Sequence, residues 1–138
     1  MFPLLISLFL FMSPHNPAPA KLSVEITNVR AAGGTLRAAL YKPGAKFGKT
    51  KPDFYKNIPV RQTGSLTFDF DVAPGEYAIA VYHDKNDNDK LDKNLVGYPR
   101  EPFGFSNNYR PVVSAPDFQD CAFELQENGS VVSIKLID

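Results

Sequence analysis

The chain has 138 residues, and its 15 Lys and Arg residues balance 15 Asp and Glu residues. A net charge of zero gives no electrostatic basis for binding nucleic acid, so we expect no nucleic-acid partner. Hydrophobic residues make up 43% and charged residues 22% of the chain, which is the composition of a globular protein rather than a disordered one. This length predicts a single domain.

The N-terminal segment is typical of an export signal. An apolar run at residues 2–12 is too short to span a bilayer, which needs roughly 20 residues, and a Pro-rich stretch follows it. That stretch ends in Ala18-Pro19-Ala20, with small residues where signal peptidase recognises its substrate. We therefore expect a signal peptide over residues 1–20, a mature domain over 21–138 without a transmembrane segment, and a secreted or periplasmic location. No Lys or Arg precedes the run, which leaves an uncleaved anchor as the alternative.

Cysteine and histidine are scarce, and this scarcity removes much enzyme chemistry. Cys121 is the only cysteine, so no intramolecular disulfide can form, and its apolar surroundings predict a buried, inert thiol in a strand. His15 would leave with the signal peptide, so His83 is the only histidine of the mature chain. Zinc sites built on several His or Cys residues are excluded.

From Lys21 onward, apolar and polar residues alternate with the period of a strand. The pattern predicts an all-β, single-domain sandwich of about seven antiparallel strands, of the immunoglobulin-like or prealbumin-like kind. Asn128-Gly129 predicts a hairpin turn between the last two strands, and residues 42–57 are expected to form a long lysine-rich loop. The expected strands cover residues 21–29, 35–41, 58–62, 65–72, 76–83, 121–126 and 130–137.

Charge is distributed unevenly along the mature chain. Residues 21–61 carry nine Lys or Arg and two Asp or Glu, a sum of +7, whereas residues 62–138 carry six and thirteen, a sum of −7. One interpretation is that the two surfaces complement each other within the fold. The other is that a basic face on residues 42–61 meets an anionic polymer or headgroup.

An Asp- and Asn-rich segment follows the expected strand 76–83. Calcium takes roughly six to eight oxygen ligands, and a tight loop with Asp or Asn at alternate positions can direct them to one point. Positions 1, 3, 5, 7 and 9 of the D-x-[DN]-x-[DN] calcium-loop pattern are held by Asp84, Asn86, Asn88, Lys90 (through its main-chain carbonyl) and Asp92. These residues are the predicted Ca²⁺ ligands.

The segment departs from that pattern at two positions. Position 6, usually Gly, is Asp89, one of the few residue types that tolerate a left-handed conformation. Position 12, usually Glu, is Leu95, so that ligand is absent or comes from elsewhere, for instance Glu101. No helix pattern flanks the loop, and we expect an affinity of only about 10⁻⁴ to 10⁻³ M. The alternative is a solvated turn held by side-chain to main-chain hydrogen bonds.

Aromatic, amide and guanidinium groups gather after the acidic segment, as they do on surfaces that bind sugars or peptides. The same residues could instead pack an ordered loop onto its own sandwich. His83, at the end of the preceding strand, is expected to be hydrogen-bonded to a loop carboxylate, or else to contact the ligand. The candidate ligand-binding residues are His83, Tyr98, Arg100, Phe103, Phe105, Asn107 and Asn108.

The stretches PGEYAIAVYHDKNDNDKLDKNLVGYPREPFGFSNN and PDFQDCAFEL resemble the bacterial secreted proteins of domain-of-unknown-function family 2141. The resemblance runs from about Leu22 to Leu136, and its most specific parts include His83-Asp84 and the Gly104–Asn108 segment. It implies an exported β-sandwich, similar to prealbumin-like and immunoglobulin-like modules, with no assigned activity. Family members often have Gly at the places held here by Asp87 or Asp89.

These observations together predict a non-catalytic, monomeric binding module with a calcium-binding loop and an unknown envelope or extracellular ligand. One alternative is a hydrolase that uses His83 with Asp84 or Asp92. Another is a purely structural envelope component whose oppositely charged faces pack against neighbours.

Overall fold

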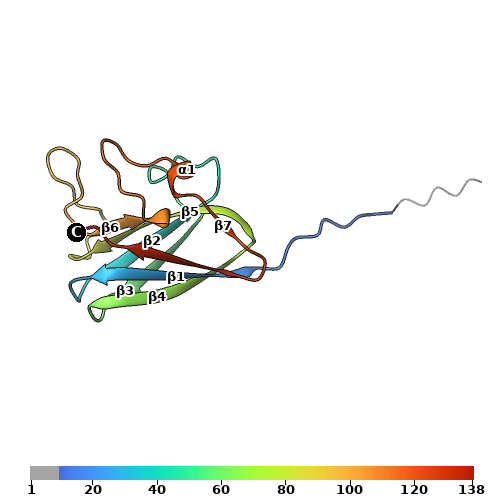
Figure 1. Cartoon of the computed structure of the whole chain (residues 1–138), viewed down its shortest axis with the longest axis horizontal. Helices are drawn as coiled ribbons and strands as arrows, with labels where there is room; N and C mark the ends of the chain where they lie inside the picture. Colours follow the sequence, from blue (N-terminus) through green and yellow to red (C-terminus); the bar gives the residue numbers. More distant parts are fainter. Residues whose placement is uncertain (1–9) are drawn as a thin grey trace, which may run out of the picture.

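The computed structural model describes residues 10–138 and contains eight strands and two short helices. The strands are β1 (Ala20–Val29), β2 (Thr35–Tyr41), β3 (Phe54–Pro59), β4 (Gly64–Val72), β5 (Gly75–Asp84), β6 (Phe103–Phe105), β7 (Phe123–Leu125) and β8 (Ser130–Lys135). A 3₁₀ turn, η1 (Ser106–Asn108), and a single helical turn, α1 (Phe118–Cys121), complete the elements. Residues 10–19 extend away from the folded part (Figure 1).

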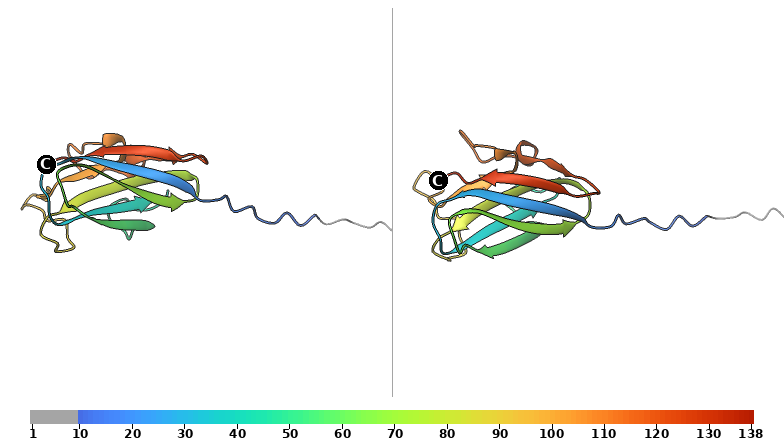
Figure 2. Two further views of the ribbon diagram at one scale, coloured as in Figure 1. Left: turned by 90° about the horizontal axis from the view of Figure 1, so that it is seen from below. Right: turned by 60° about the horizontal axis from the view of Figure 1, so that its bottom comes forward.

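The strands form two packed sheets, which confirms the all-β sandwich. The smaller sheet has the order β4-β1-β8, and the larger has the order β3-β2-β5-β6, with β7 paired to the start of β5. Figure 2 shows β1, β4 and β8 as one layer lying across the strands of the other. The β1–β8 pair is parallel and the other strand pairs are antiparallel.

Alternation along the strands builds the core between the sheets. On β1, Leu22 and Val24 face inward and pair with Phe70 and Phe68 of β4. Ile26 pairs in parallel with Ile134 of β8, and both side chains are fully buried. Burying one such side chain contributes about 1.5–3 kcal/mol, so the inward face of β1 holds the smaller sheet against the larger one.

Strand β5 is buried on both faces. Its inward residues Ile79 and Val81 belong to the main core, while Ala78 belongs to a second cluster with Phe47 and Cys121 on the other side of the sheet. The larger sheet is therefore partly covered on its outer face. The cover consists of loop residues and α1 rather than a third layer of strands.

The predicted C-terminal hairpin is wrong. Gly129 closes a turn by donating its main-chain N–H to the Gln126 carbonyl oxygen at 3.0 Å. However, β7 pairs with β5 and β8 pairs with β1, so the two strands enter different sheets. A turn motif fixes the local reversal of the chain, but not which strand accepts the hydrogen bonds beyond it.

Three further features of the secondary structure differ from the prediction. The strand expected near residues 58–62 is β3 and begins earlier, at Phe54, inside the expected loop. Strand β6 was not expected, because three residues are too few to show a period. Cys121 is buried, but it ends α1 instead of starting a strand.

Residues 10–19 of the predicted signal peptide lie outside the sandwich. Residues 1–9 are outside the described residues, and within 10–138 no helix has the length and apolar character needed to cross a bilayer. Ala20, the last residue of the predicted signal, is buried as the first residue of β1 and pairs with Val72. Export and cleavage after Ala20 stay predictions.

Candidate functional site

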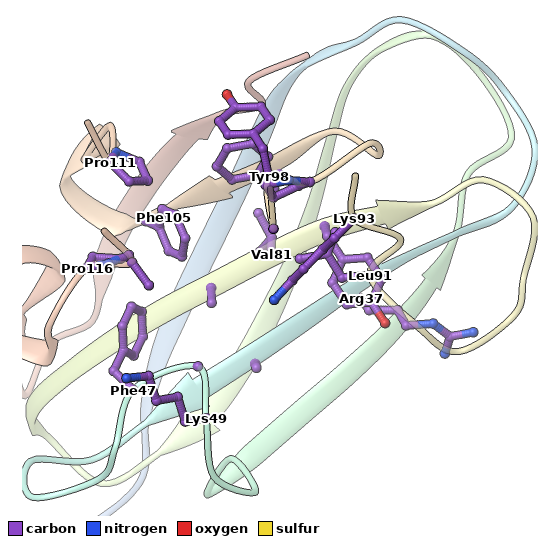
Figure 3. A pocket seen from close by; sticks show the side chains of 18 of the residues that line it. Arg37, Phe47, Lys49, Val81, Leu91, Lys93, Tyr98, Phe105, Pro111 and Pro116 are labelled. Atoms are coloured by element: carbon purple, nitrogen blue, oxygen red, sulfur yellow. The ribbon is translucent and has the colours of Figure 1, made fainter. Parts of the chain in front are cut away.

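A pocket of about 620 Å³ lies on the outer face of the larger sheet. Its floor is formed by β2 and β5, and three loops surround it: residues 42–53, 85–102 and 109–117. These loops project from one side of the sandwich (Figure 1), and Figure 3 shows their side chains around the opening. Small-molecule sites usually occupy about 300–1,000 Å³, so the pocket has the size of a ligand site.

Small side chains keep the floor of this pocket open. Ala39 of β2 and Ala80 of β5 are cross-strand partners, both half-buried and both lining the pocket. Larger residues lie two positions away on the same face: Arg37 and Tyr41 on either side of Ala39 in β2, and Tyr82 after Ala80 in β5. The alanine pair therefore forms a recess between larger neighbours.

A row of aromatic rings forms one wall of the pocket. The ring centroids of Tyr98 and Phe103 are 5.7 Å apart, those of Phe103 and Phe105 5.9 Å, and those of Phe105 and Phe47 5.9 Å. Phe47 in turn lies 5.1 Å from Tyr41, edge to face. Such pairs each contribute about 0.5–1.5 kcal/mol beyond their buried area. The row links two loops to β2 and β6, so this wall is held in place by its own packing.

The Asp- and Asn-rich loop begins at one end of this pocket and is organised around Asp84. This carboxylate is fully buried and accepts a hydrogen bond from Arg37 Nε at 2.8 Å. It also accepts the main-chain N–H groups of Asn88 at 3.2 Å and Asp89 at 2.9 Å. The second guanidinium contact of Arg37 is to Asp89 Oδ1 at 2.6 Å. Asp84, at position 1 of the calcium pattern, thus forms the hydrogen bonds that hold the start of the loop together.

The hydrogen bonds of Asp84 decide its protonation. Burial alone would raise the pKa of this carboxyl, but the hydrogen bond from Arg37 and those from the main-chain N–H groups of Asp89 and Asn88 outweigh it and lower the pKa. Asp84 is therefore ionised at neutral pH. Its charge is compensated by Arg37, which lies diagonally across on β2, two residues after Thr35, the direct cross-strand partner of Asp84.

The loop turns as the sequence predicts. Asp87 and Asp89 adopt left-handed conformations, with φ of 51° and 63°. Asp87 Oδ1 accepts the Thr35 hydroxyl at 2.6 Å, which ties the loop to the start of β2. Asp is one of the residue types that tolerate positive φ, so the tight turn forms without glycine.

Three of the predicted metal ligands come together on the exposed side of the loop. The side-chain amides of Asn86 and Asn88 donate to the Asp92 carboxylate at 2.8 Å and 2.9 Å. Asn88 Oδ1 accepts the main-chain N–H of Lys90 at 3.0 Å. Asp84 is turned away toward Arg37. In residues 10–138, no three His, Cys, Asp or Glu side chains are grouped so that they could hold a metal ion together.

Glu101 supports this loop from the other side. It is buried, and its two carboxylate oxygens accept the main-chain N–H groups of Lys85 at 3.1 Å and Asp92 at 3.2 Å. One side chain thus joins both ends of the Asp- and Asn-rich segment. Glu101 is the candidate replacement metal ligand of the sequence. In this structure its carboxylate accepts hydrogen bonds from main-chain N–H groups.

His83 faces the core and not the pocket. It is 1% exposed, its cross-strand partner is Leu36, and Nε2 lies 2.7 Å from the Gly33 carbonyl oxygen. Its partner is therefore a main-chain carbonyl instead of the expected loop carboxylate, and Nε2 carries the proton. Nδ1 has no hydrogen-bond partner in the described part of the chain.

The other candidate ligand residues divide into two groups. Tyr98, Phe103 and Phe105 line the pocket. Asn107 donates to the Ala122 carbonyl at 2.8 Å, and Asn108 accepts the main-chain N–H of Lys135 at 2.9 Å. These two amides fasten η1 to neighbouring segments and lie outside the pocket lining, as does the exposed Arg100.

Part of the pocket is not predicted from the sequence. Phe47 lies in a loop that the sequence predicts only as lysine-rich, and the segment 111–116 contains no motif. The only sequence feature that indicates the pocket floor is the presence of an alanine, Ala39 or Ala80, in each of two strands, at positions where larger residues are usual. Their pairing depends on the β2–β5 register, which one strand alone does not reveal.

The fold and the site define a two-sheet β-sandwich with a ligand-sized pocket on the outer face of its larger sheet. The chain belongs to DUF2141, a family described as an uncharacterized protein conserved in bacteria, whose model matches residues 24–133. This match confirms the family resemblance. No curated protein and no solved structure matches the chain.

Proposed function

We propose that this protein is a binding protein that takes the apolar part of a small ligand into the outer-face pocket. The observation that carries the proposal is the recess over Ala39 and Ala80, walled by the aromatic row from Tyr98 to Tyr41. A site of this size, mostly apolar and with a few polar groups, suits a small molecule.

Exposed apolar residues around the opening support the proposal. Val96 is 87% exposed, Val112 is 92% exposed and Val113 is 95% exposed, and all three line the pocket. Leu95, next to Val96, is fully exposed. A gathering of exposed apolar side chains around a cavity marks an interaction site more often than single scattered ones do.

The hydrolase alternative has less support from the geometry. His83 is enclosed in the core, and consecutive strand residues point to opposite faces, so His83 and Asp84 do not share a site. A general base must reach the proton that it removes. At 1% exposure, the His83 imidazole offers a substrate little access.

Filling the recess tests the proposal. Nile red, a neutral apolar dye, should bind the wild-type protein with increased fluorescence, and Ala80→Leu should weaken this binding at least about tenfold by occupying the floor. Ala32→Leu, at an exposed residue outside the pocket, is the matched control and should bind as the wild type does. Unchanged binding by a folded Ala80→Leu variant would refute the proposed site.

A second variant protects the test against a folding defect. Tyr98 is 49% exposed and ends the aromatic row, so Tyr98→Ala should keep the fold and still weaken dye binding. If both variants melt like the wild type and bind the dye equally well, the pocket does not hold the ligand.

We also propose that the loop binds Ca²⁺ weakly, because Asn86, Asn88 and Asp92 converge on its exposed side. The expected affinity is about 10⁻³ M, so ten times that concentration should stabilise the fold by about 1.4 kcal/mol. Thermal melts in chelator, magnesium and calcium, repeated on Asp92→Asn, test this. A melting temperature that is the same in calcium and chelator would remove calcium from the proposal.

Export is the remaining part of the proposed function. Cleavage after Ala20 would leave Lys21 as the first residue of the mature chain. N-terminal sequencing and the mass of the protein recovered outside the cytoplasm measure this directly. A recovered protein that retains residues 1–20 would favour the uncleaved anchor.

A further inference from the structure

The charges that line the pocket have one sign. Its charged lining residues are Arg37, Lys49 and Lys93, and within the described chain no Asp or Glu lines it. A pocket with an apolar floor and only cationic side chains would disfavour a cationic ligand and favour an anionic one.

Arg37 is not free to bind a ligand anion. Its guanidinium contacts Asp84 at 2.8 Å and Asp89 at 2.6 Å, which satisfy its charge and two of its donors. Lys49 and Lys93, by contrast, are exposed, and neither forms an ion pair with any residue of 10–138. The two lysines are therefore the available cations of the pocket.

The two lysines belong to different walls. Lys49 lies in the loop 42–53 beside Phe47, and Lys93 lies in the loop 85–102, from which its side chain points back across the pocket (Figure 3). A ligand seated on the alanine floor would present its anionic end to one of the two ammonium groups.

The rest of the lining argues for a chain of carbon atoms and against a polyhydroxylated ligand. Apart from the charged residues and tyrosine hydroxyls, the polar side chains of the lining are those of Asn57 and Ser114. A sugar would bring more hydroxyl groups than these few side chains can pair, and each unpaired buried polar group weakens binding. An acyl chain brings none.

We infer that the ligand is an acyl amphiphile with an anionic head group, its chain lying over Ala39 and Ala80 and its head group paired with one of the two lysines, Lys49 or Lys93. This inference rests on the proposed function, since it assigns a ligand class to the same pocket. We commit to a monomeric amphiphile in solution, such as a fatty carboxylate, as the source of this chemistry.

Three ligands with the same chain test the head group. Dodecanoate and dodecyltrimethylammonium, each below its critical micelle concentration, and dodecan-1-ol, below its solubility limit, should compete with Nile red in the order dodecanoate, dodecan-1-ol, dodecyltrimethylammonium. In Lys49→Gln/Lys93→Gln, dodecanoate binding should weaken about fivefold through the loss of the ion pair, whichever lysine forms it, and dodecan-1-ol binding should change less than about twofold.

The chain offers a matched control for the double variant. Lys46 and Lys85 are exposed lysines of the same two loops and lie outside the pocket lining. Lys46→Gln/Lys85→Gln makes the same change in net charge, so it should leave dodecanoate binding within about twofold of the wild type. An equal loss in both double variants would show a general charge effect and overturn the assignment of the two lysines.

The outcomes separate this inference from the proposed function. If Nile red binds in an Ala80-dependent way but dodecan-1-ol competes as well as dodecanoate, the pocket stands and the anionic head group is refuted. If none of the three displaces the dye, the acyl class is refuted. If the dye itself does not bind, the proposed function fails first.

A vesicle arm tests the source of the ligand. Sedimentation with phosphatidylglycerol vesicles should leave the protein in the supernatant when monomeric dodecanoate binds. Binding to vesicles without binding to monomeric dodecanoate would replace the free amphiphile by a membrane surface and overturn the inference.

Discussion

Replacing Asp84 by Asn tests whether this carboxylate holds the loop beside the pocket. Asp84→Asn keeps the size of the side chain and removes its charge, so the pairing with Arg37 and at least one of the three hydrogen bonds that the carboxylate accepts are lost. Removing one partner of a buried ion pair costs about 3–5 kcal/mol. Arg37 is 18% exposed and keeps its contact with Asp89, so we expect the lower end, about 3 kcal/mol at pH 7.

Urea unfolding is the suitable assay. The chain has six Tyr and no Trp, so tyrosine fluorescence and circular dichroism can follow the transition. Asp71→Asn is the matched control, because Asp71 is an exposed residue of β4, and the same chemical change there should alter the free energy of unfolding by less than about 0.5 kcal/mol.

The pH dependence adds a second check. The pKa of Asp84 in the folded state lies below its usual value of 3.8, so its carboxylate stabilises the fold fully above that value. This contribution is lost as the pH falls below 3.8 through the folded-state pKa. The difference between the wild type and Asp84→Asn should therefore shrink in acid. A loss under about 1 kcal/mol at pH 7, or a difference that does not change in acid, would refute this account.

Three further predictions concern packing and reactivity. Gly34→Ala should cost about 1–3 kcal/mol more than Gly33→Ala, because both glycines have positive φ but only at Gly34 would a Cβ meet backbone, 2.3 Å from the Asp84 carbonyl oxygen; equal melting temperatures would contradict this. Gly104→Ala should lower the free energy of unfolding by about 1–3 kcal/mol, because the added Cβ would lie 2.8 Å from Ile134 Cγ2. Urea unfolding measures this loss. Burial raises the pKa of the Cys121 thiol to about 12, so a maleimide at pH 7 should label it only in urea; labelling of the native protein at the unfolded rate would show an accessible thiolate.

Much of the fold could be predicted because strands leave a local signature. The alternation of Leu22, Val24 and Ile26 predicts one buried face, and the structure buries those residues. The strand of residues 35–41 has the bounds that its pattern predicts. These features depend on neighbours in the sequence, which one chain is sufficient to show.

The errors share one physical cause. Asn128-Gly129 reverses the chain as predicted, yet β7 and β8 join different sheets. Packing across the whole core determines which strand a given strand pairs with. A turn motif does not specify that partner. Strand β6 is recognised only through its pairing with β5.

The candidate site divides in the same way. The sequence predicts a turn of Asp and Asn residues and an aromatic segment after it, and it places Asp89 in a left-handed conformation. It does not predict that Asp84 turns to Arg37, because Arg37 lies 47 residues earlier and meets it only through the β2–β5 pairing. The expected hydrogen bond from His83 to a loop carboxylate is absent for a similar reason. The imidazole is instead hydrogen-bonded to the Gly33 carbonyl oxygen, which lies 50 residues earlier in the chain.

The sequence by itself determined the composition class, the strand pattern, the acidic turn and the family of this protein, because each is written in residues close together in the chain. The tertiary structure alone decided that Ala39 and Ala80 form one recess, that Phe47 and Tyr98 wall it, and that Lys49 and Lys93 stand on different sides of it. These residues come from separate strands and loops. Only the register of the larger sheet and the packing of its outer face bring them to one place.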